Sequence, residues 1–176
     1  MQDEESLVQR IKKRDQDAFA EIYERYFDRI YRYIFLRVGN TQEAEDMAQQ
    51  VFLKALEGIG SFKWKNIPLS AWLFRIAHNQ VVDFLRKKPK KAQVPIEPHH
   101  LRSGDDPHLI AEQRFETEQL ISALRELTEA QREVLSLRFS SELSIAEVAK
   151  VMGKSEGAVK ALQHSAIVAL RRKLIS

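Results

Sequence analysis

A signal for the start of a helix and a signal for a turn stand close together near the C-terminal end of this 176-residue chain, in the segment from Ser144 to Leu170. Ser144 and Glu147 are three residues apart, which is the spacing of a capping box, so a helix is predicted to begin at Ile145. Gly153 follows where the chain must turn, because glycine adopts positive φ without steric cost. The pattern predicts a helix, a tight turn and a second helix.

The second helix of this pair is predicted to begin after Ser155, which is a suitable N-cap. Val159 and Leu162 supply its apolar side, and Ala149 on the first helix is small enough for a close crossing. This spacing is typical of a helix-turn-helix, whose second helix enters the major groove of DNA. The same residues also suit an ordinary helical hairpin, and that alternative remains open at this point.

Composition limits the class of protein. With 44% hydrophobic residues the chain can bury a core, and its lack of cysteine excludes disulfides and thiolate zinc sites. No stretch approaches the roughly 20 apolar residues of a membrane-spanning helix. The N-terminus has no apolar run of signal-peptide length, so a soluble cytoplasmic protein is expected.

The net charge of +3 is too small to indicate a nucleic-acid partner by itself, but the cations are unevenly distributed. Five of the six positions from 86 to 91 are lysine or arginine. Such a cluster suits contacts with phosphates, and it equally suits the C-terminus of a helix, where cations complement the macrodipole.

Apolar residues recur at intervals of three and four along most of the chain, which predicts an all-α fold. One helix carries this pattern from Phe19 to Val38 and is closed by Gly39. A second opens at Asn40 and ends near Gly58. Further helices are predicted from Leu69 to Lys87 behind Pro68, from Leu109 to Leu127, and after a second capping box formed by Thr128 and Gln131.

Prolines, Gly104 and polar residues interrupt this periodicity between Pro89 and Pro107. The sequence therefore predicts two small helical domains, residues 1–88 and 111–176, joined by a flexible linker over residues 89–110. His99, His100 and His108 in the linker could bind zinc in principle, but no supporting polar partners are evident. We expect solvated histidines and no metal site.

Two helical units with a helix-turn-helix in the second resemble the layout of a bacterial sigma factor. The residues from Glu43 to Phe52 are similar to the acidic polymerase-binding helix of region two in the extracytoplasmic-function (ECF) group. The residues from Trp72 to Asn79, followed by Asp83 and Arg86, are similar to its promoter-melting and −10 helix. The C-terminal unit resembles region four, so that the resemblance covers roughly residues 6–88 and 111–174.

Glu45, Asp46 and Gln49 share one surface of a helix whose other face is apolar. The resemblance implies that this surface, together with Phe52, binds core RNA polymerase at the clamp helices of its largest subunit. Gln50 stands where the family commonly has an acid, which weakens the charge. An ordinary solvated face is the alternative, whereas the Glu-x-x-His pairing of helical metal sites is absent.

The loop before the Leu69–Lys87 helix combines aromatic and cationic residues, as is suited to holding a base unstacked from single-stranded DNA. Such aromatics can equally close a core. The resemblance implies a pocket for a flipped −10 base, base contacts by Asp83 and Arg86, which could also form an ion pair, and phosphate contacts by Lys87; Trp72 is expected mainly as a core anchor. The complete expected set is Phe62, Trp64, Asn66, Trp72, Asn79, Asp83, Arg86 and Lys87.

Lysine and glutamine on the second helix of the helix-turn-helix can meet guanine and adenine edges in the major groove. The resemblance implies recognition of the −35 promoter element by this helix. Leu162 and Ser165 stand where many members carry arginine, so two cations are missing. The expected contact residues are Ser155, Glu156, Lys160, Ala161, Gln163, His164, Ser165 and, on phosphate, Arg171.

The resemblance thus implies a sigma factor that binds core polymerase, including the flap of the second subunit, and promoter DNA, with an anti-sigma factor as a further partner. No catalytic residue, cofactor or metal is expected, because no Ser-His-Asp, Cys-His or metal-ligand constellation has the required spacing. The alternative is a helix-turn-helix regulator that binds duplex DNA without polymerase.

Overall fold

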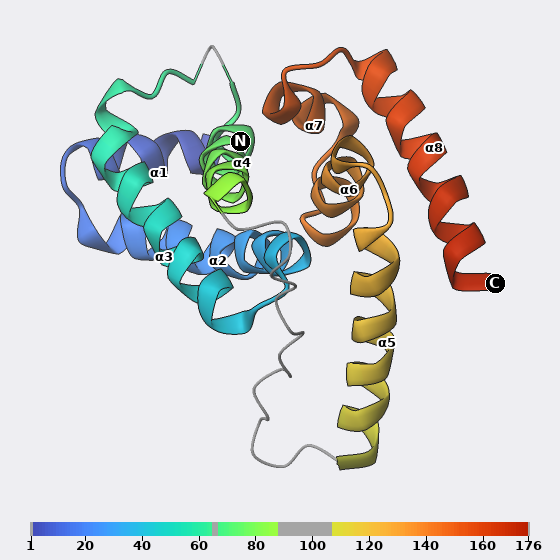
Figure 1. Ribbon diagram of the computed structural model, residues 1–176. Coiled ribbons are helices and arrows are strands. Elements are labelled where there is room, and N and C mark those ends of the chain that lie inside the picture. Colours follow the sequence, from blue (N-terminus) through green and yellow to red (C-terminus); the bar gives the residue numbers. More distant parts are fainter. Residues whose placement is uncertain (1, 65–66, 88–106, 176) are drawn as a thin grey trace.

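The computed structural model describes residues 2–64, 67–87 and 107–175, and within these ranges every regular element is a helix (Figure 1). The predicted all-α fold is confirmed. In chain order the elements are α1 (Gln2–Lys12), α2 (Gln16–Val38), α3 (Thr41–Gly58), the 3-10 helix η1 (Ile59–Ser61), α4 (Leu69–Lys87), α5 (Pro107–Arg125), α6 (Glu129–Leu135), the π-helical turn η2 (Ser136–Ser140), α7 (Ile145–Met152) and α8 (Glu156–Ile175). Asn66 and most of the predicted linker, with His99 and His100, lie outside the described residues.

The helix ends in the N-terminal half are fixed by local chemistry. The Asp15 carboxylate caps α2 by accepting from the backbone N–H groups of Asp17 and Ala18. Gly39 ends α2 in the left-handed region with a φ of 75°, as its predicted closing role requires. Asn40 then caps α3 by accepting from the Glu43 N–H at 2.8 Å. These caps place α3 directly after α2, so the two helices form an antiparallel pair.

Helices α2, α3 and α4 surround the core of this half, and α1 covers one side of α2 (Figure 1). Leu7, Val8 and Ile11 bury the inner side of α1. Polar contacts join the same two helices, since the Tyr26 hydroxyl donates to Glu4 at 2.5 Å. Helix α1 was not predicted, because these three apolar residues are set among charged ones.

The C-terminal half shows both predicted capping boxes. Ser144 and Glu147 exchange side-chain and backbone hydrogen bonds of 3.1 Å at the start of α7. Gly153 ends α7 with a φ of 65°, and the Ser155 hydroxyl accepts from the Ala158 N–H at 3.1 Å to start α8. Helices α7 and α8 therefore form the predicted helix-turn-helix.

Two details of this half differ from the sequence-based expectation. Helix α5 begins at Pro107, inside the predicted linker, because proline in the first turn of a helix needs no N–H partner. The helix that starts at Glu129 continues as the π-helical turn η2, where the hydroxyls of Ser140 and Ser141 donate to the Ser136 carbonyl. Hydroxyls that compete for a helix carbonyl disturb the regular ladder.

Candidate nucleic-acid interface and partner surface

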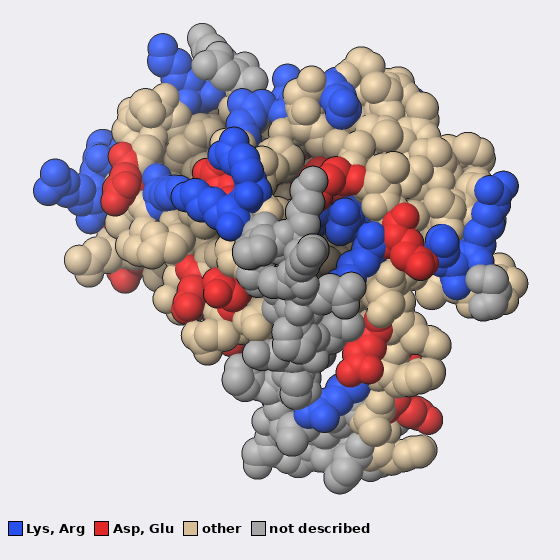
Figure 2. Space-filling view, viewed as in Figure 1, with Lys and Arg blue, Asp and Glu red and all other residues tan. Residues whose placement is uncertain are grey.

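Helix α3 presents a polar surface opposite its buried face. Asp46 and Gln49 are exposed and Glu45 is half-buried, while Ala44 and Val51 lie in the core. The Gln42 amide donates to the Asp46 carboxylate at 3.3 Å. In Figure 2 acidic side chains lie over the start of α3. The predicted arrangement of an acidic outer face and an apolar inner face is present.

Phe52 does not belong to that surface. Only 2% of Phe52 is exposed. The centroid of its ring lies 4.8 Å from that of Tyr23 and 6.1 Å from that of Phe27. In this structure Phe52 has a core role that fixes α3 on α2, and its contact with polymerase stays a prediction. The exposed apolar residues of α3 are Leu53 and Leu56, at 52% and 44%. The helical period predicted Leu56 on the buried face, which is wrong, and it gave no indication of Leu53.

The loop after η1 closes the core with its first aromatic residue. Phe62 is 3% exposed and packs against the rings of Trp64 and Trp72 at 5.8 and 5.0 Å between centroids. Its carbonyl accepts from the Lys12 ammonium at 2.8 Å, which ties α1 to this loop. Phe62 therefore closes the core in this structure, and its part in the −10 set stays a prediction. Trp64 and Trp72 are both half-buried against the core.

The C-terminal half of α4 carries exposed polar groups. Asn79 and Lys87 are exposed, and Asp83 accepts from the Arg86 guanidinium in an exposed ion pair. Figure 2 shows lysine and arginine side chains gathered around the end of α4 that faces the viewer. The ion pair that the i, i+3 spacing allowed is thus formed, and it orients the arginine along the helix surface.

Most of the predicted recognition residues lie on the outer surface of α8. Ser155, Glu156, Lys160, Ala161, His164, Ser165 and Arg171 are exposed, whereas Gln163 is half-buried. The Gln163 side-chain oxygen is buried without a hydrogen-bond partner. The Ser165 hydroxyl donates to the Leu162 carbonyl at 3.1 Å and lies 3.4 Å from the Gln131 amide. Leu162 itself packs against the core.

The two halves meet at a buried carboxylate that the sequence analysis did not single out. Glu133 on α6 is 3% exposed. It accepts from the Tyr33 hydroxyl at 2.6 Å and from Arg37 Nε at 2.8 Å, and it lies 2.7 Å from His78 Nδ1. Burial alone would raise the pKa of Glu133, but the hydrogen bond from His78 and the charge of Arg37 lower it below the ordinary value. Glu133 is therefore held as a carboxylate.

Further contacts hold α7 and the turn after η2 on the N-terminal half. The Ser70 hydroxyl donates to the Glu147 carboxylate, and Arg75 donates to the Lys150 carbonyl at 2.6 Å. Arg29 donates to the Ser141 carbonyl at 2.8 Å. Helix α7 consequently lies against α4 (Figure 1).

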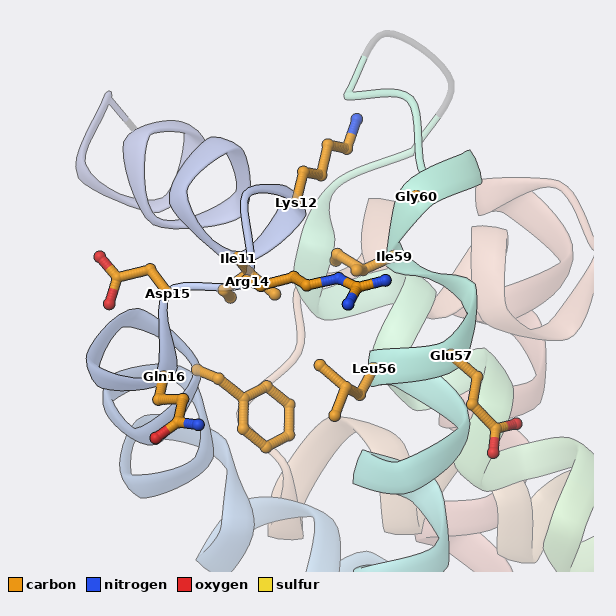
Figure 3. Close-up of a pocket in the computed structure, with 10 residues that line it drawn as sticks. Ile11, Lys12, Arg14, Asp15, Gln16, Leu56, Glu57, Ile59 and Gly60 are labelled. Atoms are coloured by element: carbon orange, nitrogen blue, oxygen red, sulfur yellow. The ribbon is translucent and has the colours of Figure 1, made fainter.

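A groove of about 490 Å³ opens between the corner that joins α1 to α2 and the end of α3. In Figure 3 Leu56 and Ile59 point into it, Arg14 extends across it and Glu57 turns away. Residues from the predicted polymerase and promoter sets do not line this groove.

The described residues hold no group of three side chains suited to a metal ion. His108 instead faces Glu112 on α5 at 3.5 Å. Among the described helices, each is too short or too polar to cross a bilayer.

Comparisons with known proteins agree with this architecture. Residues 22–90 match the family model of Sigma-70 region 2, and residues 123–172 match that of Sigma-70, region 4. The chain is 39% identical over 173 residues to the ECF RNA polymerase sigma factor BldN of Streptomyces coelicolor, an alignment that covers 96% of this chain and 64% of BldN. It is 32% identical over 181 residues to the ECF RNA polymerase sigma factor SigW of Bacillus subtilis, covering 95% of this chain and 94% of SigW.

The fold is also that of a solved structure. CnrH in complex with the cytosolic domain of CnrY superposes with a TM-score of 0.77 at 22% identity, covering 98% of this chain and 97% of that chain. From the two family regions, in this order, and the identity with SigW, the chain belongs to the ECF group of RNA polymerase sigma factors, which are transcription initiation factors and not enzymes.

Proposed function

We propose that this sigma factor binds core polymerase through the outer surface of α3, melts and recognises the −10 element through the loop after η1 and α4, and recognises the −35 element through α8. The observation that carries the proposal is that polar side chains are exposed on helices whose opposite faces pack in the core. Core polymerase and promoter DNA meet in the cytoplasm, where we expect the protein to act.

The proposed division into two domains and a linker is supported by the packing of α1 and α5. Residues 1–88 form region 2, including α1, because α1 packs on α2. Residues 89–110 are proposed as the linker, although its last part is already helical in α5. Residues 111–176 form region 4, and α5 belongs to this domain because it packs on α8.

The polymerase contact is assigned to Glu45, Asp46 and Gln49, which face the clamp helices of the largest subunit. Carboxylates on such a rim steer a cationic partner and fix its orientation more than they add affinity. Leu53 and Leu56 add apolar area beside them. Region 4 is proposed to contact the flap of the second subunit.

The −10 contact is assigned to the loop after η1 and to exposed polar groups of α4. Trp64, with Asn66 nearby in the sequence, supplies the aromatic group for an unstacked base, and Asn79 supplies hydrogen bonds. Asp83 and Arg86 face bases, and Lys87 contacts phosphate. Phe62 and Trp72 support this surface from the core.

The −35 contact is assigned to the exposed face of α8. We assign Lys160, His164 and Ser165, which are exposed, to base edges, and Ser155 and Glu156 to contacts near the start of the helix. Arg171 is assigned to phosphate. Ala161 is the proposed apolar contact, whereas Gln163 must turn outward from its half-buried position to contribute.

An anti-sigma factor is a further proposed partner. The sigma factor RpoE was solved in complex with the anti-sigma factor NepR from Bartonella quintana, and this chain shares its fold with a TM-score of 0.70 at 24% identity. That alignment covers 89% of this chain and 96% of RpoE. A partner that covered the α3 surface of this chain would compete directly with core polymerase.

Run-off transcription with bacterial core polymerase on pooled genomic fragments of the host tests the proposal. Specific new transcripts are expected with the wild-type protein and not with Asp46→Arg. Glu57→Arg is the matched control, since Glu57 is an exposed acid at the other end of the same helix. Full activity of Asp46→Arg would remove α3 from the polymerase contact. Footprints on duplex DNA without polymerase, together with no transcripts, would favour the regulator alternative.

A further inference from the structure

The groove at the corner between α1 and α2 lies beside the loop after η1, and its chemistry suits a base of single-stranded DNA. We propose that it is a second nucleobase pocket, which holds an unstacked base of the single strand that continues from the −10 element toward the start site. This inference rests on the proposed function, because it extends the assigned promoter contacts to a surface outside them.

The groove has an apolar floor and enough room for a base. Its volume is about 490 Å³, and its apolar lining is Ile11, Phe19, Leu56 and Ile59. Phe19 is half-buried and Leu56 is 44% exposed, so both side chains can be reached from water. Bases of single-stranded DNA stack on aromatic side chains of this kind, whatever their sequence, because every base has a flat π-face.

The charge over the groove is positive. In Figure 3 Arg14 extends across the groove, while the carboxylates of Asp15 and Glu57 point away from it. The Asp15 carboxylate is also paired with Arg10 Nε at 2.8 Å. Within the described part of the chain, the Arg14 guanidinium has no carboxylate partner. The groove is therefore complementary to an anionic ligand with a flat apolar group.

The backbone of Arg14 indicates that its side chain has a role. Its φ is 67°, in the left-handed region, at the turn that ends α1. The turn is closed by hydrogen bonds of 2.8 Å from the Arg14 N–H to the Ile11 carbonyl and of 3.0 Å from the Asp15 N–H to the Arg10 carbonyl. Glycine is the usual residue in such a turn, and strain of this kind concentrates at functional sites. Arginine here keeps a strain that glycine would relieve, which a contact made by the guanidinium explains.

The groove adjoins the residues assigned to the −10 base. Lys12, which lines the groove, donates to the Phe62 carbonyl at 2.8 Å and points toward this loop in Figure 3. The Phe62 ring in turn lies 5.8 Å from that of Trp64, centroid to centroid. A strand whose base is held at Trp64 therefore has the groove as its neighbouring binding surface.

The strand beyond the −10 element is available for this contact. Transcription begins downstream of that element, so the strand opened there stays single toward the start site. Lys13 at the corner and Lys63 in the loop are exposed and are assigned to its phosphates. The planar Arg14 guanidinium is assigned to the face of the base, which would lie between it and Phe19.

Binding of the polymerase holoenzyme to two promoter forks tests the pocket. In one fork the single strand ends at the −10 element, and in the other it continues toward the start site. The wild type is expected to bind the longer fork at least about fivefold more tightly, the low end of what stacking one base contributes. Arg14→Gly should abolish this gain. Lys54→Gln, which removes an exposed cation of α3 outside the groove, should retain it.

The glycine variant separates a lost contact from a lost fold. Because glycine adopts left-handed backbone without strain, Arg14→Gly should melt at the same temperature as the wild type or higher. A longer fork whose additional nucleotides lack bases should lose most of the gain, although its phosphates remain. The full gain with that fork would overturn the base pocket in favour of charge alone, and equal binding of the two intact forks by the wild type would overturn the site altogether.

Photo-crosslinking identifies the occupant directly. p-Benzoylphenylalanine in place of Gln16, which is exposed at the rim of the groove, is expected to crosslink to the single strand in the holoenzyme–fork complex. The same group in place of Gln113, an exposed residue of α5, is not. Crosslinks from position 16 to a polymerase subunit would overturn the pocket in favour of a protein contact. If the holoenzyme binds neither fork, the proposed function fails instead, and crosslinking of the free protein to a single-stranded oligonucleotide decides whether the groove binds DNA.

Discussion

Arg37 binds two carboxylates of α6 that differ mainly in exposure. The side chain of Glu133 is 4% exposed and that of Glu129 is 64% exposed. An ion pair in water is weakened by solvent, whereas a buried partner that loses its counter-charge is left unpaired in a low-dielectric site. The two pairs should therefore respond very differently to substitution.

We predict that Arg37→Gln lowers the free energy of unfolding by up to about 3–5 kcal/mol, the usual cost of removing one partner of a buried pair. Separation of the domains, which would expose Glu133 to water, limits this loss. Glu129→Gln should change stability by no more than about 0.5 kcal/mol. Urea denaturation of the two variants provides the comparison, and equal losses would contradict the difference in burial.

Asn79 is exposed and does not belong to the core that α4 contributes to. We predict that Asn79→Ala retains binding to core polymerase but reduces opening of promoter DNA, because its amide would no longer bond an unstacked base. Permanganate reactivity of unpaired thymines measures the opening. Reactivity equal to that of the wild type would show that Asn79 has no role in melting.

At the scale of elements, two glycines end helices in the left-handed region, and each allows the next helix to start in a new direction. At Gly153 a Cβ atom would meet no heavy atom within 4 Å, so only backbone strain opposes a larger residue. The turn between α7 and α8 thus depends on one backbone conformation.

We predict that Gly153→Ala lowers the free energy of unfolding by about 1–2 kcal/mol, the cost of left-handed backbone for an L-residue. Gly60→Ala is the control: it also has open space around it but no left-handed φ, so it should be neutral or stabilising by up to about 1 kcal/mol. Thermal unfolding distinguishes the two variants. A loss at Gly60 as large as that at Gly153 would contradict the assignment to strain.

The elements that could be predicted from the sequence are those with local signals. Asn40, Thr128 and Ser144 cap the helices that their spacing indicated. Helix α1 has too few apolar residues to show a period, and η2 arises from hydroxyl contacts that periodicity does not reveal. In the candidate site, Phe52 and Phe62 were assigned to contacts because their type suits binding, while their burial depends on tertiary packing.

At the scale of the whole molecule, the contact between the domains had no sequence signal. Tyr33 and His78 lie 100 and 55 residues away from Glu133, and a single glutamate in a helix gives no indication of such partners. The charged and titratable groups around this carboxylate are Arg37 and His78 from region 2 and Glu129 from its own helix, with the neutral hydroxyl of Tyr33.

Acid should loosen the packing of region 4 on region 2. Because the pKa of Glu133 is lowered in the packed state, its contribution to stability is present above the ordinary glutamate pKa of about 4.3 and is lost as the pH falls below that value. Energy transfer between labels on cysteines introduced at the exposed positions Glu24 on α2 and Gln113 on α5 should fall over this range in the wild type more than in Glu133→Gln. An identical pH dependence in both proteins would contradict a role for this carboxylate. The pKa of Asp15 is also lowered, by its hydrogen bond with Arg10. Because Asp15 is present in both proteins, its contribution cancels in the difference between the wild type and Glu133→Gln.

Every described donor to Glu133 comes from the other domain. This limits how the domains of the chain can be exchanged with those of its relatives. In a chimera that takes residues 111–176 from a relative with an apolar side chain at the position of Glu133, the buried face of Arg37 would have no matching charge. Such a hybrid would favour separated domains even if each half folded perfectly. The two domains of this chain are therefore not freely interchangeable modules, and exchange between relatives requires that both sides of this contact be transferred together.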